Sequence, residues 1–279
     1  MKTVTKVKIA KLIFNTLIFF GFKKKNLVKR NSINWNLDLS EGIDLSIFLF
    51  GAFQGEIIKS IVSAIFKKKI QNNKTFYILD IGSNIGDKSL SLTRNLINKK
   101  INNFKIFSIE PTDYAFEKQS INLNLNPDLK KKIFLSKLYI SNKNFRKKST
   151  YSSWKLEGNQ KGHKIHKGVK KEINQKTKNI SLDKFIKKNN IKNNIILKID
   201  VDGFELNILK SCIETLKKYN LIIFMEYAPY ALKEYGSNIY EFNNFIKKYD
   251  YKIFDLNFKR LNQVEIKEGS SKDIVLIKE

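Results

Sequence analysis

Two glycines, Gly82 and Gly86, follow a short apolar run in the stretch ILDIGSNIGDKSLSL at residues 78–92. Glycine lets the backbone approach a ligand closely and adopt positive φ angles, so a glycine turn after a strand can hold a nucleotide-type cofactor. The spacing is GxxxG rather than the GxGxxG that places a pyrophosphate on a helix N-terminus. By itself, this spacing also describes an ordinary tight turn beside surface acids.

Acidic residues end the apolar runs around this turn. Asp80 closes the first run, and Glu110, Asp200 and Glu226 close three later ones. A carboxylate at Glu110 can accept hydrogen bonds from both hydroxyl groups of a ribose. A ring of carboxylates repels an anionic dinucleotide, whereas S-adenosylmethionine carries a sulfonium and an ammonium group, which Asp80 can bind unless it braces the turn. We therefore expect S-adenosylmethionine, bound by Asp80, Gly82, Ser83, Asn84, Gly86, Glu110 and Pro111.

Other acidic residues are candidates for the side of the site that binds the methyl acceptor. Asp200 ends its strand beside the expected methyl group, where it can take a proton from an acceptor hydroxyl group. Asp202 and Glu205 match either catalytic acids or a helix capping box. Glu226 can bind an acceptor hydroxyl group or anchor the loop that follows it. The predicted catalytic set is Asp200, Asp202, Glu205 and Glu226, and no metal site is assigned.

The elements that position these residues alternate from residue 76 onward. Unbroken apolar runs predict buried strands, and helical spacing follows several of them, including a helix over about residues 204–219. Buried strands that alternate with helices are typical of a parallel sheet covered on both faces, with ligands at the carboxyl ends of the strands. The predicted fold class is therefore α/β and Rossmann-like, with a mostly parallel central sheet.

Two segments fall outside this alternation. We expect residues 1–70 to form an N-terminal helical appendage to a domain at 71–279, with a variable insertion at 141–179. The apolar run at 12–22 is shorter than the roughly 20 residues that span a bilayer. Residues 1–25 therefore predict either a helix packed on the domain or a peripheral helix at a membrane surface. The insertion holds His163 and His166, for which a solvated loop is favoured over a metal site.

The amino-acid composition narrows the classes of molecule that this protein is expected to bind. The net charge of the 279 residues is +27, but only four of the 53 basic residues are arginine. Since arginine makes the bidentate contacts favoured in phosphate and base recognition, a specific nucleic-acid partner is not expected. The single cysteine, Cys212, excludes an intrachain disulfide and agrees with a cytoplasmic location, or with the inner face of the cytoplasmic membrane if residues 1–25 bind lipid.

Four sequence blocks occur in an order that resembles one known family. They are LDIGSNIGDKSLSL, FSIEPTDYAFEKQSINLNLNP, SLDKF and LKIDVDGFELNILKS, and GIDLSIFLFGAFQGE at 42–56 resembles the segment ahead of the family's domain. Over about residues 76–228 the chain resembles the FkbM family of S-adenosylmethionine-dependent class I methyltransferases. Asp202 stands where that family usually has glutamate, which keeps the charge and shortens its reach.

The resemblance implies methyl transfer, usually to a hydroxyl group of a sugar or another natural product. The expected partner is therefore a small-molecule or glycan acceptor, and the expected process is O-methylation in carbohydrate modification. Two other functions stay open. One is an RNA methyltransferase, for which EYAPY at 226–230 is a superficial signal. The other is a non-catalytic, membrane-associated scaffold that binds the cofactor.

Overall fold

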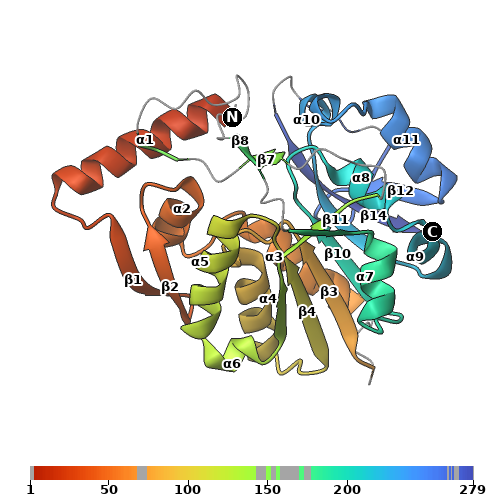
Figure 1. Cartoon of the computed structure of the whole chain (residues 1–279), viewed down its shortest axis with the longest axis horizontal. Helices are drawn as coiled ribbons and strands as arrows, with labels where there is room; N and C mark the ends of the chain where they lie inside the picture. Colours follow the sequence, from red (N-terminus) through yellow and green to blue (C-terminus); the bar gives the residue numbers. More distant parts are fainter. Residues whose placement is uncertain are drawn as a thin grey trace.

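The computed structural model describes residues 3–67, 74–142, 149–151, 155–157, 170–172, 177–262, 264, 266 and 270–278. An eight-stranded sheet with the order β13-β12-β14-β11-β10-β3-β4-β5 runs through the centre of the molecule (Figure 1). Its parallel neighbours are β3 (Phe76–Ile81), β4 (Phe104–Ile109), β5 (Ile133–Ser136), β10 (Ile195–Ile199) and β11 (Ile222–Tyr227). The antiparallel part comprises β14 (Lys272–Lys278), β12 (Tyr251–Phe254) and the edge strand β13 (Arg260–Leu261). The predicted mostly parallel sheet is confirmed.

The strand order reverses between β3 and β10. After β3 the chain adds β4 and β5 on one side, and it then returns to add β10 and β11 on the other. In open α/β sheets, ligands bind at the carboxyl ends of the strands beside such a switch point. The turn after β3 and the residues after β10 therefore lie next to each other at the expected ligand position.

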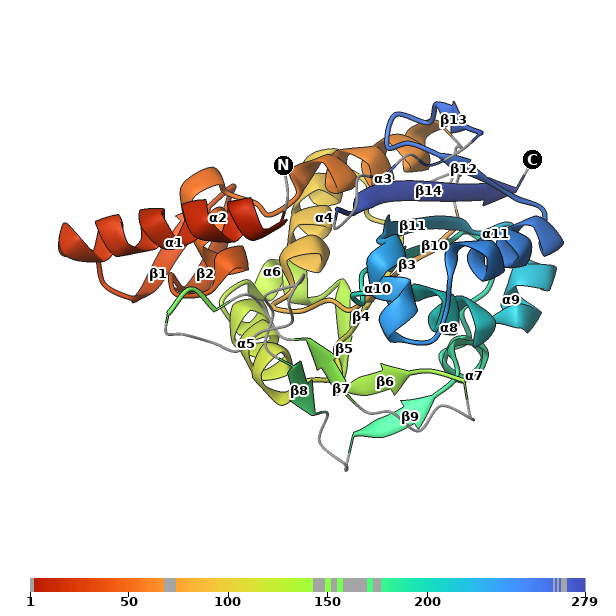
Figure 2. The same ribbon diagram turned by 90° about the horizontal axis from the view of Figure 1, so that it is seen from above.

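Helices cover both faces of the sheet (Figure 2). The first face carries α3 (Gly55–Lys67), α4 (Asp87–Asn98), α5 (Asp113–Asn124) and α6 (Pro127–Lys130). The second carries α7 (Leu182–Lys188), α8 (Glu205–Lys210), α9 (Ile213–Lys218) and α11 (Ile239–Lys248), with α10 (Pro229–Glu234) directly after β11. Because neighbouring strand residues point to opposite faces, Ile78 and Ile196 pack with the first set and Leu79 and Leu197 with the second.

Two elements predicted from the sequence are interrupted. The helix expected over residues 204–219 ends at Lys210 and resumes at Ile213. At the break, the hydroxyl group of Ser211 donates to the carbonyl of Ile208 and accepts from the backbone N–H of Leu182, so the interruption ties α8 to the start of α7. The third predicted strand divides into β5 and β6 (Leu138–Ile140), and β6 pairs with β9 (Lys178–Ile180) outside the main sheet.

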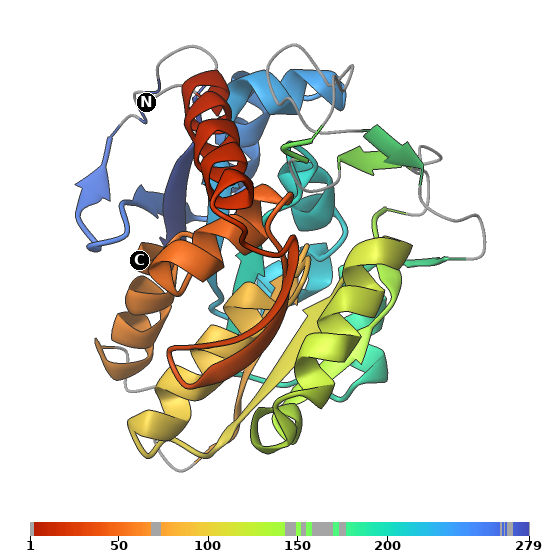
Figure 3. The ribbon, with the colours of Figure 1, turned by 90° about the vertical axis from the view of Figure 1, so that its left-hand side faces the viewer.

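The N-terminal part contains helices and a hairpin. It consists of α1 (Thr3–Phe19), β1 (Lys25–Arg30), β2 (Ile33–Asp38) and α2 (Gly42–Phe50). The prediction of a helical appendage did not include the hairpin, which lies across α4 and α5 (Figure 3). The side-chain carbonyls of Asn122 and Asn126 accept the backbone N–H groups of Asn36 and Asn34, both at 2.9 Å. These bonds fasten β2 to the domain.

The predicted insertion at 141–179 is described only in part. It contains β7 (Ser149–Tyr151) and β8 (Lys170–Glu172), which pair antiparallel, and β9 begins at its end. His163 and His166 lie outside the described residues. In the described ranges, no group of three or more His, Cys, Asp or Glu side chains has an arrangement that can hold a metal ion.

A buried ion pair joins α2 to α5. The carboxylate of Asp44, whose side chain is 1% exposed, accepts hydrogen bonds from Nζ of Lys118 and from the backbone N–H of Asp38. Burial raises the pKa of Asp44 to about 6, although the positive charge of Lys118 opposes that rise. The carboxylate therefore depends on its lysine partner to remain ionised inside the protein.

We expect Lys118→Met to lower the free energy of unfolding by about 3–5 kcal/mol at pH 8, since it leaves a buried carboxylate without a counter-charge. The loss should shrink at pH 5, where Asp44 takes up a proton. Urea unfolding at both pH values measures the effect. The control is Lys118→Met combined with Asp44→Asn, which should recover part of the loss at pH 8. Equal losses at the two pH values would contradict this account.

Candidate active site

A cavity of about 410 Å³ lies at the carboxyl ends of β3, β10 and β11. One part of its lining is the glycine turn after β3, with Gly82, Ser83 and Asn84. A second part is acidic and comprises Asp200, Asp202 and Glu226. A third part comes from α1, α2 and the loop after α2, including Ile9, Ile13, Leu49, Phe50 and Phe53. The volume is in the range of small-molecule sites.

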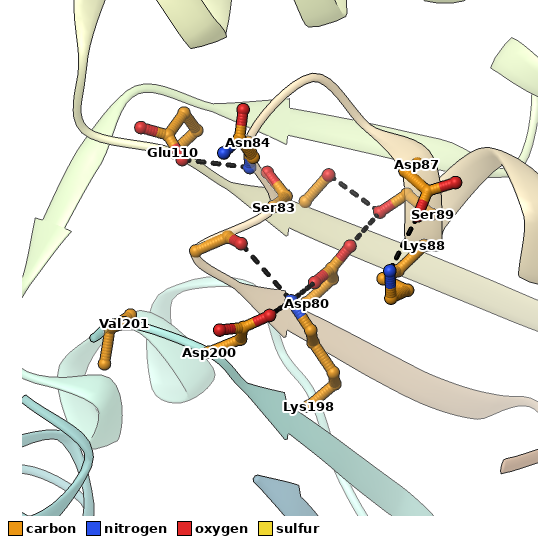
Figure 4. Close-up of polar contacts among 12 residues, drawn as sticks. Asp80, Ser83, Asn84, Asp87, Lys88, Ser89, Glu110, Lys198, Asp200 and Val201 are labelled. Atoms are coloured by element: carbon orange, nitrogen blue, oxygen red, sulfur yellow. Dashed lines mark hydrogen bonds and ion pairs between the residues drawn. The ribbon is translucent and has the colours of Figure 1, made fainter. Parts of the chain in front are cut away.

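A buried lysine connects the turn to the acidic part. The side chain of Lys198 is 2% exposed, and its Nζ lies 3.0 Å from Oδ1 of Asp80 and 3.5 Å from Oδ2 of Asp200 (Figure 4). Nζ also donates to the carbonyl oxygen of Gly82 at 3.3 Å. Burial alone lowers the pKa of Lys198, but the two carboxylates outweigh it and raise that pKa. Lys198 therefore stays protonated and does not serve as a base.

Asp80 continues this network away from the cavity. It is fully buried, and its Oδ2 accepts from the hydroxyl group of Ser89 at 2.7 Å, which lies 2.8 Å from the hydroxyl group of Ser108. The amide of Gln119 donates to Ser108 and accepts from Ser83 at 2.9 Å. The buried polar chain, as we call it, comprises Lys198, Asp80, Ser89, Ser108, Gln119 and Ser83. Asp80 is not among the lining residues of the cavity, and its contacts with Lys198 and Ser89 are ones that brace the turn.

The glycine turn has the conformation that its sequence predicts. Gly82 has a φ of +76°, and a Cβ there would lie 2.0 Å from the backbone oxygen of Asp200. Gly86, with a φ of +88°, precedes α4 and packs against Gln119. Oδ1 of Asn84 is buried and has no hydrogen-bond partner among the described residues. Asn84 is one of the lining residues, and an amide oxygen without a partner can accept from an ammonium or hydroxyl group of a ligand.

Glu110 holds the same turn from the end of β4. Its Oε2 accepts from the backbone N–H of Asn84 at 3.0 Å, and its Oε1 accepts from the N–H and the hydroxyl group of Thr112 at 3.0 and 2.6 Å. Burial raises the pKa of Glu110, and these hydrogen bonds oppose the rise. Pro111 follows, and its carbonyl accepts from the hydroxyl group of Thr177 at 3.4 Å. Oε1 thus uses both of its lone pairs, whereas Oε2 keeps one that suits a ribose hydroxyl group.

Four carboxyl groups gather on the acidic side of the cavity. Asp200, with a side chain 31% exposed, and Asp202 and Glu226 line it, and Asp273 in β14 is the register partner of Glu226. Burial, with the charge of Asp200, raises the pKa of Asp273 to about 6. Burial and the charges of Asp200 and Asp202 raise the pKa of Glu226 well above its usual range. Oε1 of Glu226 accepts a hydrogen bond from the hydroxyl group of Ser271 at 2.6 Å, which opposes the rise of that pKa.

Glu205 does not line the cavity, in contrast to its predicted catalytic position. It is 1% exposed, and its Oε1 accepts from the backbone N–H groups of Val201 and Gly203, both at 3.2 Å. The N-cap position of α8 is occupied by Phe204, and Asp202 adopts a φ of +51°, so the predicted capping box does not form as drawn from the sequence. Glu205 instead braces the loop that presents Asp200 and Asp202.

Several residues in or next to the cavity were not predicted from the sequence. Lys88 donates to Asp87 at 2.6 Å and to the carbonyl of Phe53 at 2.7 Å, and its Nζ lies 4.9 Å from the centre of the Phe53 ring. Asp273 reaches the site only because β14 is inserted antiparallel beside β11. The residues of α1 have apolar spacing that indicates packing but not its location. Of these residues, only Lys88 could have been proposed from the sequence, because it lies two positions after Gly86 of the glycine turn.

The sheet order, the glycine turn after β3 and the acid at the end of β4 together define a class I, Rossmann-like methyltransferase fold. The model of one family, described as the methyltransferase FkbM domain, matches residues 80–253, which is more than half of the chain. The chain therefore belongs to the FkbM methyltransferase family. This confirms the predicted family, its fold class and S-adenosylmethionine as the methyl donor.

Solved structures similar to this chain include three enzymes of low sequence identity. An FkbM methyltransferase from Methylobacillus flagellatus KT is 14% identical with a TM-score of 0.44, over 72% of this chain and 43% of that one. A putative transferase from Pyrococcus horikoshii is 13% identical with a TM-score of 0.38, over 92% and 71%. A magnesium protoporphyrin IX methyltransferase from Synechocystis PCC 6803, with bound SAH, is 9% identical with a TM-score of 0.42, over 98% and 100%. This chain thus spans less than half of the first protein, and no curated protein matches it.

The close contact between Gly82 and Asp200 predicts that alanine at Gly82 destabilises the protein more than alanine at Gly236. Gly236 has nearly the same φ, +74°, but a Cβ there meets nothing within 4 Å. Gly236→Ala should therefore lower the free energy of unfolding by about 1–2 kcal/mol, which is the cost of the left-handed backbone conformation for alanine. Gly82→Ala should lower the free energy of unfolding by a further ~1–3 kcal/mol, because its Cβ overlaps the backbone of Asp200 directly after β10. It should also weaken binding of S-adenosylhomocysteine. Urea unfolding and calorimetry measure both, and equal effects of the two substitutions would refute the steric explanation.

The burial of Glu205 predicts a pH dependence of stability. Burial raises the pKa of Glu205 from 4.5 to about 7, so the native state holds a proton that the unfolded state releases between those values. Stability should therefore fall as the pH rises through this interval, by about 3 kcal/mol. Glu205→Gln cannot ionise and should remove this part of the pH dependence, whereas Glu117→Gln, at an exposed position on α5, should not. Thermal unfolding from pH 4 to pH 8 tests this, and parallel profiles for wild type and Glu205→Gln would count against it.

Proposed function

We propose that this protein transfers the methyl group of S-adenosylmethionine to a hydroxyl group of a sugar, a glycan or another small natural-product acceptor. The observation that supports this most directly is the position of Asp200. Its carboxylate is partly exposed in the cavity, beside the glycine turn, and is paired with the buried Lys198. An acid in that position can receive the proton of an acceptor bound next to the methyl donor.

The residues of the turn fit the cofactor. Gly82 and Asn84 line the cavity, Asn84 offers an acceptor atom that has no partner among the described residues, and Oε2 of Glu110 keeps one lone pair. The neighbouring carboxylates favour a cationic ligand. When bound, S-adenosylmethionine supplies an electrophilic methyl carbon, whose bond to sulfur breaks as the acceptor oxygen bonds to it. Asn84 and Glu110 would hold the amino-acid and ribose portions between them.

The acidic residues would position and deprotonate the acceptor. Asp200 takes the hydroxyl proton while the new carbon–oxygen bond forms, and Lys198 keeps that carboxylate in place. Glu226 lines the same cavity and can bind a second hydroxyl group of the acceptor. Holding the acceptor oxygen in line with the methyl carbon is expected to supply most of the rate enhancement.

The composition of the cavity favours an acceptor with both hydroxyl groups and apolar surface. Asp202 and Glu226 lie in the same lining as the rings of Phe53 and Tyr230. Carboxylates beside an aromatic ring suit a sugar, whose hydroxyl groups bind the acids while its apolar face packs on the ring.

We expect Asp200→Asn to bind S-adenosylmethionine with unchanged affinity and to lose turnover by about 10²–10⁴-fold, the usual contribution of a general base. Calorimetry measures binding, and transfer of a labelled methyl group into cell extract measures turnover. Asp250→Asn is the matched control, because Asp250 is exposed in the turn after α11 and is not part of the cavity. Undiminished transfer by Asp200→Asn would remove Asp200 from the base role.

The acceptor class has its own experiment. Mass spectrometry of glycans and lipids from cells with and without the protein should reveal one species heavier by the mass of a CH₂ group. The cells with Asp200→Asn should lack it. Cofactor binding without any methylated glycan, lipid or small molecule would argue for a non-catalytic scaffold, and methylated RNA alone would replace the proposed acceptor class.

A further inference from the structure

An exposed apolar surface lies where α1 ends and β1 begins. Residues 19–29 hold four of the fifteen large apolar side chains that the described residues expose, whereas Ile9, Leu49 and Phe50 line the cavity. Among the most exposed are Phe19 at 85%, Phe20 at 72% and Leu27 at 73%. We call residues 19–29 the N-terminal tip. Figure 1 shows that the end of α1 and the start of β1 lie at the left edge, away from the sheet.

The same surface is basic. The tip contains Lys23, Lys24, Lys25 and Lys29, of which Lys24 pairs with Glu157, and residues 1–37 contain no aspartate or glutamate. The alternation of β1 places Lys25, Leu27 and Lys29 together on its exposed face, and Lys23, two residues before the strand, is also exposed. Exposed aromatic rings flanked by lysines are the combination that binds the headgroup region of an anionic bilayer.

We propose that the N-terminal tip docks on the surface of a membrane that contains anionic lipid. Phe19, Phe20 and Leu27 enter the headgroup region, and the lysines face the lipid phosphates. A second copy of the chain is a less favourable occupant, because two tips facing each other would bring like charges together with no acid in residues 1–37 to pair with them.

Docking at the surface is distinct from spanning the bilayer. Among the described helices, none alone has the length and apolar character needed to cross a membrane. The pair α2 and α3, bent by 72° at its break, passes that test by length and composition only. In α3, seven residues are buried, including Ile57, Ile61 and Ile65, so its apolar face is already occupied by the protein core.

The tip and the cavity share one helix. Lys6, Ile9, Ala10 and Ile13 of α1 line the cavity, and Phe19 ends the same helix. A docked tip therefore brings the cavity within reach of an acceptor that is itself carried on a lipid. This consequence rests on the proposed function, whereas the docking itself does not.

The test is co-sedimentation of the full chain with vesicles, in the absence of cofactor and acceptor. Wild type should bind vesicles of equal parts phosphatidylcholine and phosphatidylglycerol, and the double variant Phe19→Ser and Phe20→Ser should bind at least tenfold more weakly, because two rings lose their burial. Both side chains are exposed, so the fold should be unaffected. Tyr240→Ser is the matched control, since Tyr240 is 76% exposed on α11.

A second pair of variants tests the charge. Replacing Lys23 and Lys25 by glutamine should weaken binding about fivefold for each lysine at low salt. Replacing Lys187 and Lys188, an exposed pair on α7, removes the same charge elsewhere and should have a much smaller effect. Equal binding to vesicles of phosphatidylcholine alone would overturn the proposal, as would equal binding by the Lys23 and Lys25 variant and the Lys187 and Lys188 variant.

Two further outcomes are decisive. In the first, wild type does not bind the vesicles but self-associates in sedimentation velocity, and the Phe19 and Phe20 variant does not self-associate. The tip is then an interface between copies of the chain, and the membrane proposal fails. Affinity of that variant for S-adenosylhomocysteine should equal that of wild type. Failure of vesicle binding with intact cofactor binding and turnover would therefore leave the proposed function standing.

Discussion

The buried ion pair between Lys198 and Asp80 is the interaction on which the site depends. The two residues are register partners on β10 and β3, the strands on either side of the switch point. Neither charge can be buried alone without a large desolvation cost, so each requires the other. Once paired, Lys198 also holds Asp200 and the carbonyl of Gly82, and Asp80 holds Ser89. This ion pair thereby fixes the glycine turn, Asp200 and α4 relative to one another.

The cavity is completed by a part of the chain that is remote in sequence. Its turn and acids come from the sheet, but an apolar wall comes from α1, α2 and the loop after α2. That wall is held in place by β2, fastened through Asn122 and Asn126, and by the Asp44–Lys118 pair. Attachment of the N-terminal part is therefore a condition for forming the site, and a change far from Asp200 can alter how the acceptor is bound.

Charge is distributed very unevenly between the exterior and the site. The chain carries a net charge of +27, yet Asp200, Asp202, Glu226 and Asp273 gather around one cavity. Their proximity raises the pKa of Glu226 and of Asp273, which reduces the mutual repulsion, and Lys198 compensates part of the remainder. The exposed lysines face solvent, and those of the N-terminal tip lie beside exposed apolar side chains. Negative charge is thus concentrated at the cavity, while the chain as a whole is strongly basic.

The sequence alone determined the local features. Apolar runs and glycines predicted the sheet and the turn, because burial and positive φ leave direct marks on residue type, and the strand-end rule identified Asp200 and Glu226 as lining residues. Contacts across the sheet leave no such mark. That Asp80 is buried against Lys198, that Glu205 braces a loop, that Asp273 joins the acids and that α1 forms a wall were decided only in the tertiary structure. Each depends on strand register or on packing between segments distant in the chain, and residue type and spacing do not encode which distant partner a side chain meets.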